Sequence, residues 1–226
     1  MNDKEIDIKG NELAIILRDS IIEEIPFIGS VAVKIISLQQ RVRHERIISF
    51  IEDLVSSLKG IDKNEINWEY VSGQDFSDMI ISIIQRVEQT FSKEKLHRFK
   101  EILIKEIKTP YSSNFKDTFL DILLKINEDQ IKILSLYQKI DNGTITLTSY
   151  SLSNLGIRRF GEKRENEYIN QIYFGMNQDV YDFLIQDLLS KYQLFDIGFI
   201  RNVIGHVMVP NVSPLGKELL LFIEST

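Results

Sequence analysis

The stretch that decides the fold is Gln178-Asp-Val-Tyr-Asp-Phe-Leu-Ile-Gln-Asp-Leu-Leu-Ser-Lys-Tyr192, together with Ser213-Pro-Leu-Gly-Lys-Glu-Leu-Leu-Leu-Phe-Ile223. The first part has the composition of an acidic helix. In the second part, Ser213 is a good N-cap and Pro214 suits the first helical position, where its missing N–H would have no partner. An apolar stripe follows at helical spacing, formed by Leu215, Leu219, Leu220 and Ile223.

Between these two helices, the segment Leu194–Gly198 predicts a glycine turn, and the β-branched residues Val207, Val209 and Val212 favour a hairpin. The expected order is helix, turn, hairpin, helix. This order resembles a winged helix, a fold whose members bind nucleic acid or protein partners.

The composition predicts a globular, mainly α-helical protein. Of the 226 residues, 43% are hydrophobic, which is enough to form a core, and four prolines leave room for long helices. The chain has no cysteine, which excludes disulfides, thiolate zinc sites and cysteine nucleophiles and suits a reducing cytoplasm. The opening residues do not read as a secretion signal. A net charge of −6 argues against a surface that binds nucleic acid throughout, although a local basic patch stays compatible with it.

Apolar periodicity predicts an N-terminal helical bundle over residues 1–126 and a winged-helix-like α+β domain with a small hairpin over residues 127–226. In the bundle we expect helices over 13–25 and 31–58, a helix capped by Asp75 whose stripe runs from Met79 to Phe91, and two more with stripes from Leu96 to Ile107 and from Phe115 to Ile126. Asn127 and Gln130 predict a capped helix through Ile140. Thr144–Ser153 is expected to be a short strand or an extended loop, and Arg158–Glu167 the solvated start of a helix.

Several segments along most of the chain resemble the Abi-alpha family, bacterial proteins associated with abortive infection. These segments are Ile25–Ser30, Arg41–Arg46 leading into Phe50–Leu54, Lys93–Leu96, Asp129–Leu134 and Pro214–Leu219. The resemblance implies a role in defence against phage. It supplies no catalytic residues.

A catalytic alternative depends on Arg201-Asn-Val-Ile-Gly-His206, which resembles the short motif of HEPN ribonucleases. In that family, the arginine stabilises the cleaved phosphate and the histidine moves the proton of the RNA 2′-hydroxyl. A cation beside a group that titrates near neutrality suits this chemistry. The flanking glycines and valines favour a hairpin wing here, whereas HEPN proteins carry the motif on a helix.

Nucleic-acid binding is a further alternative. Gln186 and Lys191 on the predicted recognition helix could contact DNA, and Arg41, Arg43 and Arg46 form a second basic group that could bind nucleic acid or a partner. The recognition helix, however, carries Asp179, Asp182 and Asp187 against Lys191 alone, and phosphates repel such a surface. The sequence therefore favours a protein partner.

The uncharged run Ile25–Val33 is too short to cross a bilayer. With Phe27, Ile28 and Lys34, it could contact a membrane interface or a partner, or its apolar residues could belong to the core. The sequence shows no phosphate loop, zinc motif, serine-nucleophile motif or carboxylate cluster, so no cofactor and no metal site are predicted. We therefore expect a non-enzymatic, cytoplasmic defence sensor or effector that acts through protein partners, with a homo-oligomer as one arrangement.

Overall fold

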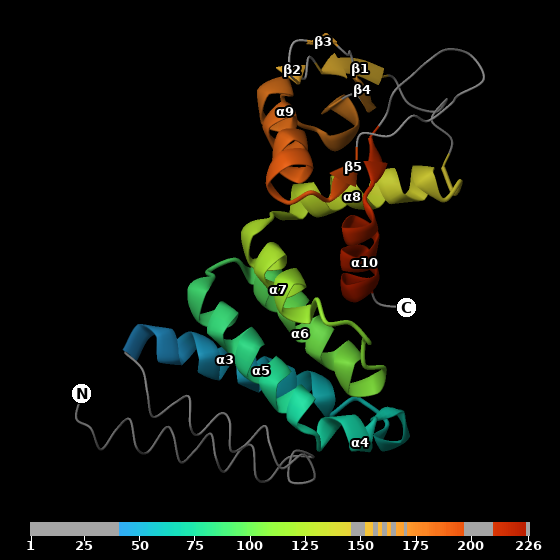
Figure 1. Cartoon of the computed structure of the whole chain (residues 1–226). Helices are drawn as coiled ribbons and strands as arrows, with labels where there is room; N and C mark the ends of the chain where they lie inside the picture. The colour runs from blue at the N-terminus through green and yellow to red at the C-terminus, as the bar shows by residue number, and fades with distance from the viewer. Residues whose placement is uncertain are drawn as a thin grey trace. The chain divides into compact units, whose positions relative to one another are not determined.

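The computed structural model describes residues 41–145, 152–155, 158–159, 162–163, 166–169, 171–196 and 210–224. The described chain is mainly helical, as the composition predicts, and its strands are short and paired two by two. It divides into two compact units, one ending at Leu124 and the other running from Lys125 to Glu224. Figure 1 shows their elements.

The first unit consists of helices that pack against one another. In chain order they are α3 (Arg41–Leu58), the short η2 (Lys63–Glu65), α4 (Trp68–Val71), α5 (Gln74–Gln89), α6 (Lys93–Lys108) and α7 (Lys116–Lys125). Helix α3 packs against α5 and α6, and α4 closes one end of the pair formed by α5 and α6. The core of the first unit contains residues of the apolar stripes that the sequence predicts, including Phe50, Leu54, Ile80, Ile83, Phe99, Leu103, Phe119 and Leu123.

Two aromatic residues of the predicted stripes are not in this core. Helix α5 ends at Gln89 because Thr90 takes an extended conformation, so Phe91 lies outside the helical period and is 82% exposed. Helix α7 starts at Lys116, and Phe115, one residue before it, is 54% exposed. The predicted cap of α5 is also wrong. Gly73 occupies the N-cap position, with no side-chain cap, and Asp75 lies in the first turn.

A buried arginine joins α5 to α7. The guanidinium of Arg86 donates to Asp121 Oδ1 from Nη2 at 2.7 Å and from Nε at 3.1 Å, and also to the Ser82 carbonyl at 2.8 Å. Its Nη2 lies 3.7 Å from an Asp117 carboxylate oxygen. These bonds give the charged group, which is buried, the partners that it needs.

The second unit begins with α8 (Glu128–Asp141), whose start is the predicted capping box: Asn127 accepts from the N–H of Gln130, and the Gln130 side chain accepts from the N–H of Asn127. The strands β1 (Leu152–Leu155) and β4 (Asn166–Ile169) pair antiparallel, with Leu152 opposite Ile169. A second pair is β2 (Arg158–Arg159) with β3 (Glu162–Lys163).

The helix start expected over Arg158–Glu167 is therefore wrong, because parts of that segment form β2, β3 and the beginning of β4. Arginine, lysine and glutamate favour a helix only weakly, and pairing with a strand elsewhere in the chain overrides such a preference. The register of β1 against β4 connects residues that a local pattern cannot relate.

The chain then forms η4 (Gln171–Phe174), α9 (Gln178–Gln186) and the π-helical turn η5 (Asp187–Lys191), of which α9 and η5 confirm the predicted acidic helix. The strands β5 (Phe195–Asp196) and β6 (Asn211–Val212) pair antiparallel before α10 (Pro214–Ile223). Ser213 caps α10 by accepting from the N–H of Gly216, and Pro214 occupies its first position, as predicted.

Candidate interaction surfaces

One face of helix α9 packs into the core of the second unit. The Asn177 side chain caps the helix by accepting from the N–H of Val180 at 3.0 Å. The inner face consists of apolar residues at helical spacing that are at most 3% exposed, namely Tyr181, Leu184, Ile185 and, in the following turn, Leu188. The Tyr181 ring stacks on Phe174, with centroids 5.4 Å apart. This packing holds the helix so that its other face points outward.

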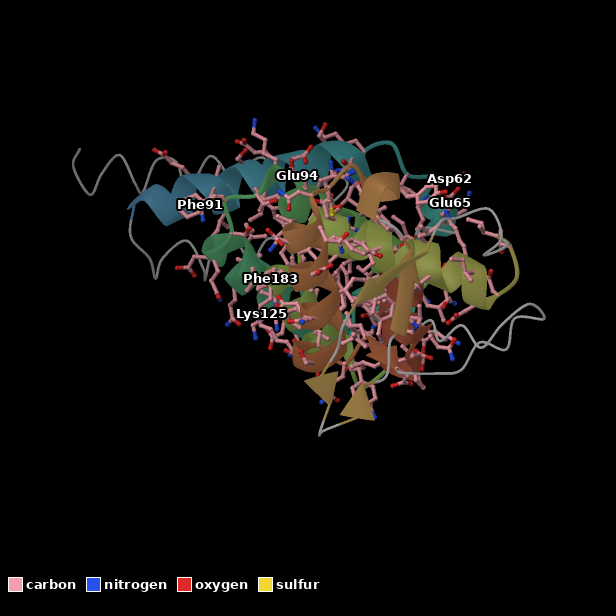
Figure 2. All side chains as sticks on the ribbon, turned by 90° about the horizontal axis from the view of Figure 1, so that it is seen from above. Asp62, Glu65, Phe91, Glu94, Lys125 and Phe183 are labelled. Atoms are coloured by element: carbon pink, nitrogen blue, oxygen red, sulfur yellow. The ribbon has the colours of Figure 1, made fainter. Side chains whose placement is uncertain are left out.

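The outward face of α9 combines apolar and acidic side chains. Phe183, which is labelled in Figure 2, is 60% exposed, and Val180, three residues before it in the helix, is 46% exposed. Asp179 and Gln186 are exposed on the same side, and Asp182 accepts a hydrogen bond from the Gln178 side chain. We call Asp179, Val180, Asp182, Phe183 and Gln186 the α9 face. An exposed phenylalanine and valine among carboxylates suit contact with a protein.

Lys191, one of the residues predicted to bind nucleic acid, lies at the end of this helix and is exposed. Its amine lies 5.0 Å from the centre of the Tyr192 ring and 3.6 Å from Asp187 Oδ2. The neighbouring Tyr192 hydroxyl and the Asp187 carboxylate raise the pKa of Lys191. The charge of Lys191 is thus paired with Asp187 and Tyr192, so it does not neutralise the aspartates of the α9 face.

A second exposed aromatic group lies in the first unit. The guanidinium carbon of Arg46 lies 3.9 Å from the centre of the Phe91 ring, in cation–π geometry, and Arg46 Nη1 donates to the Glu88 carbonyl at 2.7 Å. Phe91 is labelled in Figure 2 and belongs to the segment that joins α5 to α6. We call the pair formed by Arg46 and Phe91 the Phe91 face.

The most buried carboxylate of the described residues is not a reaction site. Glu106 is 1% exposed, and its Oε2 accepts from the Tyr70 hydroxyl at 2.7 Å and from Lys116 Nζ at 2.6 Å. Its Oε1 accepts from the N–H of Tyr111 at 3.1 Å. Burial and the Glu106 carboxylate raise the pKa of Tyr70. Both oxygens of Glu106 are satisfied within the fold, so the group serves to hold α4, α6 and the start of α7 together.

No protein-family model, curated protein or solved structure matches this chain.

Of the described residues that were predicted to be functional, Arg41, Arg43 and Arg46 belong to the first unit, and Gln186 and Lys191 belong to the second. Arg46 and Lys191 have the contacts given above, Gln186 is exposed at the end of α9, and Arg41 and Arg43 belong to the start of α3. The remaining predicted residues lie outside the described part of the chain: Phe27, Ile28, Lys34, Arg201 and His206.

Among the described residues, no group of three or more histidine, aspartate or glutamate side chains could hold a metal ion. In the same part of the chain, none of the helices combines the length and the apolar character that crossing a membrane requires.

Sequence reasoning did not single out Val180 or Phe183, although a signal was present. The stretch 178–191 contains seven apolar or aromatic residues in 14 positions, spread over more than one side of the helix. A helix on the surface of a domain buries one stripe, so part of that set had to face outward. Phe91 carried no such signal, because its exposure depends on where α5 ends.

Proposed function

We propose that this protein acts by binding another protein, and that the α9 face makes the contact. The observation that supports this proposal is the exposure of Phe183 and Val180 beside Asp179. Aromatic side chains are enriched in protein interfaces, where they bury a large area at little cost in conformational entropy. DNA and RNA phosphates would be repelled by the aspartates of the same face.

We assign the second unit to a winged-helix-like arrangement, with α9 in the position of the recognition helix and the β5–β6 pair in that of the wing. The assignment is supported by the order of α8, then α9, β5, β6 and α10, with β1–β4 and η4 inserted between α8 and α9. A DNA-reading helix in this position carries arginine, lysine, asparagine or glutamine toward the bases. Here an apolar and acidic surface stands in its place, which favours a winged helix that binds protein.

The biological context that we propose is abortive infection, in the bacterial cytoplasm and without small-molecule catalysis. The support for this context is the sequence resemblance to the Abi-alpha family. In this scheme the protein is a sensor or an effector, and its partner transmits or receives the signal through the α9 face.

The test is a phage-plating assay on cells that express the wild type or Phe183→Ser. We expect the wild type to protect and Phe183→Ser to lose about tenfold or more of that protection, because a central aromatic side chain can contribute about 2 kcal/mol or more to an interface. The matched control is Phe115→Ser, which removes a comparably exposed phenylalanine from the first unit. Melting temperatures would show that both variants are folded.

Three results would count against the proposal. Equal protection by the wild type and Phe183→Ser would remove the α9 face from the function, and failure of the wild type to protect would remove the context. Loss of protection in Arg201→Ala/His206→Ala, with Phe183→Ser active, would favour the ribonuclease alternative. Fluorescence anisotropy with labelled DNA and RNA adds a direct check, in which we expect no binding at physiological salt.

A further inference from the structure

The apolar part and the acidic part of the α9 face are neighbours on the helix surface. Phe183 is 60% exposed and lies three residues after Val180 and four after Asp179. Side chains three and four residues apart are adjacent on a helix, and Asp179 and Asp182 are also three apart. A molecule that covers the Phe183 ring therefore removes water from these two carboxylates as well.

The two carboxylates have no cationic partner within the described part of the chain. Asp179 is exposed and takes part in no ion pair there, and Asp182 accepts a hydrogen bond from the Gln178 side chain, which carries no charge. The lysine at the end of the helix, Lys191, pairs instead with Asp187 at 3.6 Å. The α9 face therefore carries a negative charge that these described contacts do not compensate.

Negative charge beside an apolar patch limits what the α9 face can bind. A neutral apolar surface would bury Phe183 but would leave the adjacent carboxylates without water and without a partner, which is costly. A nucleic acid or an anionic lipid surface would be repelled, and so would the α9 face of a second copy. A segment that carries lysine or arginine together with an apolar side chain avoids each of these costs.

The Phe91 face shows how an arginine meets an exposed aromatic ring in this protein. The Arg46 guanidinium carbon lies 3.9 Å from the centre of the Phe91 ring. Among the described residues, no cation lies over the ring of Phe183. A partner's arginine on the Phe183 ring would be within reach of the Asp179 carboxylate, because the two residues are one helical turn apart.

We infer that the partner of the α9 face is a basic segment of a protein, in which an apolar side chain is flanked by arginine or lysine. The inference rests on the proposed function, because it names the chemistry of the partner. The apolar side chain packs on Phe183 and Val180, and the cations pair with Asp179 and Asp182. The charges orient the segment and disfavour neutral and acidic competitors. The α9 face is small, so the contact is expected to be weak and reversible.

The test is a selection from a library of random short peptides displayed on yeast, with the full chain as the bait. Each round first removes peptides that bind Phe183→Ser, because a cationic peptide can adhere to an acidic protein by charge alone. We expect the enriched peptides to contain an aromatic or aliphatic residue with arginine or lysine within about four positions of it. Enriched peptides without an excess of arginine and lysine over the starting library overturn the inference. The absence of any peptide that distinguishes the wild type from Phe183→Ser overturns it as well.

Fluorescence anisotropy with one selected peptide, labelled with a dye, assigns the contact to the α9 face. Phe183→Ser is expected to weaken binding about tenfold or more, because it removes the apolar anchor. Asp179→Asn/Asp182→Asn is expected to weaken binding about fivefold, because it removes two exposed charges and leaves the shape of the face unchanged. Added salt is expected to weaken binding to the wild type more than binding to the aspartate variant. An aspartate variant that binds the peptide as tightly as the wild type overturns the inference.

Matched controls come from the first unit. Phe115→Ser removes an exposed phenylalanine there, and Glu52→Gln/Glu69→Gln removes two exposed carboxylates, so both variants are expected to bind the peptide like the wild type. Melting temperatures exclude loss of fold as the cause of weaker binding.

Failure of the inference is distinguishable from failure of the proposed function, which the phage-plating assay measures. Loss of protection in Phe183→Ser, together with enriched peptides that are neutral or acidic, would retain the α9 face as a protein-binding surface and overturn only the basic partner. Enriched basic peptides, together with full protection by Phe183→Ser, would support the chemistry of the contact and overturn its role in the proposed function.

Discussion

Gly216 has no room for a side chain. A Cβ atom at this position of α10 would lie 2.4 Å from the Leu194 carbonyl oxygen and 2.8 Å from a Val212 methyl group. Because a backbone oxygen cannot move aside as a flexible side chain can, Gly216→Ala is expected to lower the free energy of unfolding by about 1–3 kcal/mol. Denaturant titration measures this change. The control is Gly60→Ala, whose nearest neighbour would be 3.6 Å away and whose effect is expected to stay within about 0.5 kcal/mol. Equal stability of the two variants would contradict the close approach.

Burial of the Asp141 carboxylate disfavours its charged form. Its side chain is 7% exposed, Oδ2 accepts from the N–H of Val212 at 2.8 Å, and Oδ1 has no hydrogen-bond partner among the described residues. Burial raises the pKa of Asp141, while the Val212 N–H and the Lys217 amine oppose the rise. A raised pKa means that the folded state binds the proton more tightly than the unfolded state, so this group disfavours folding once the pH rises above its folded pKa.

Asp141→Asn keeps an oxygen for the Val212 N–H and removes the charge. We expect the variant to melt at a higher temperature than the wild type at pH 7, and the difference to shrink as the pH falls toward about 4. Melting curves at steps of pH test both statements. Asp129→Asn serves as the control, because its carboxylate is half-exposed near the start of α8 and its loss is expected to lower stability slightly at pH 7. A wild type that is more stable than Asp141→Asn at pH 7 would contradict this account of Asp141.

At the scale of elements, Lys116 compensates the buried charge of Glu106. The Lys116 side chain is 20% exposed, and its amine lies 2.6 Å from the Glu106 carboxylate, which Tyr70 contacts from α4. Removing one partner of such a pair leaves a buried charge, so Lys116→Ala is expected to cost about 3 kcal/mol. Lys132→Ala removes an exposed lysine that pairs with Asp129 at 3.3 Å and is expected to cost no more than about 0.5 kcal/mol. Chemical denaturation compares the two, and a similar small loss in both would show that Tyr70 and the Tyr111 N–H suffice for Glu106.

The elements that could be predicted from the sequence are those whose causes are local. The capping box of α8 and the Ser213–Pro214 start of α10 each depend on a few adjacent residues, and both are confirmed. The strand β4 depends on pairing with β1 at a distance along the chain, so the local composition of Arg158–Glu167 indicated a helix and was wrong. The exposure of Phe91 depends on α5 ending at Gln89, and element ends are poorly determined by apolar spacing. The α9 helix was predictable, but which of its apolar residues stay exposed depends on tertiary packing.

At the scale of the whole molecule, each compact unit has a core made from its own elements. Ile83 of α5 and Ile185 of α9 are each fully buried, one in each unit. Ile→Ala at such a site costs about 2–5 kcal/mol, since it removes buried apolar groups and leaves a cavity. Native-state hydrogen exchange can locate the loss. We expect Ile83→Ala to speed exchange in residues 41–124 and to leave amides of α8 and α9 nearly unchanged, and Ile185→Ala to have the converse effect. Uniformly faster exchange in both variants would show that the two cores unfold as one cooperative unit.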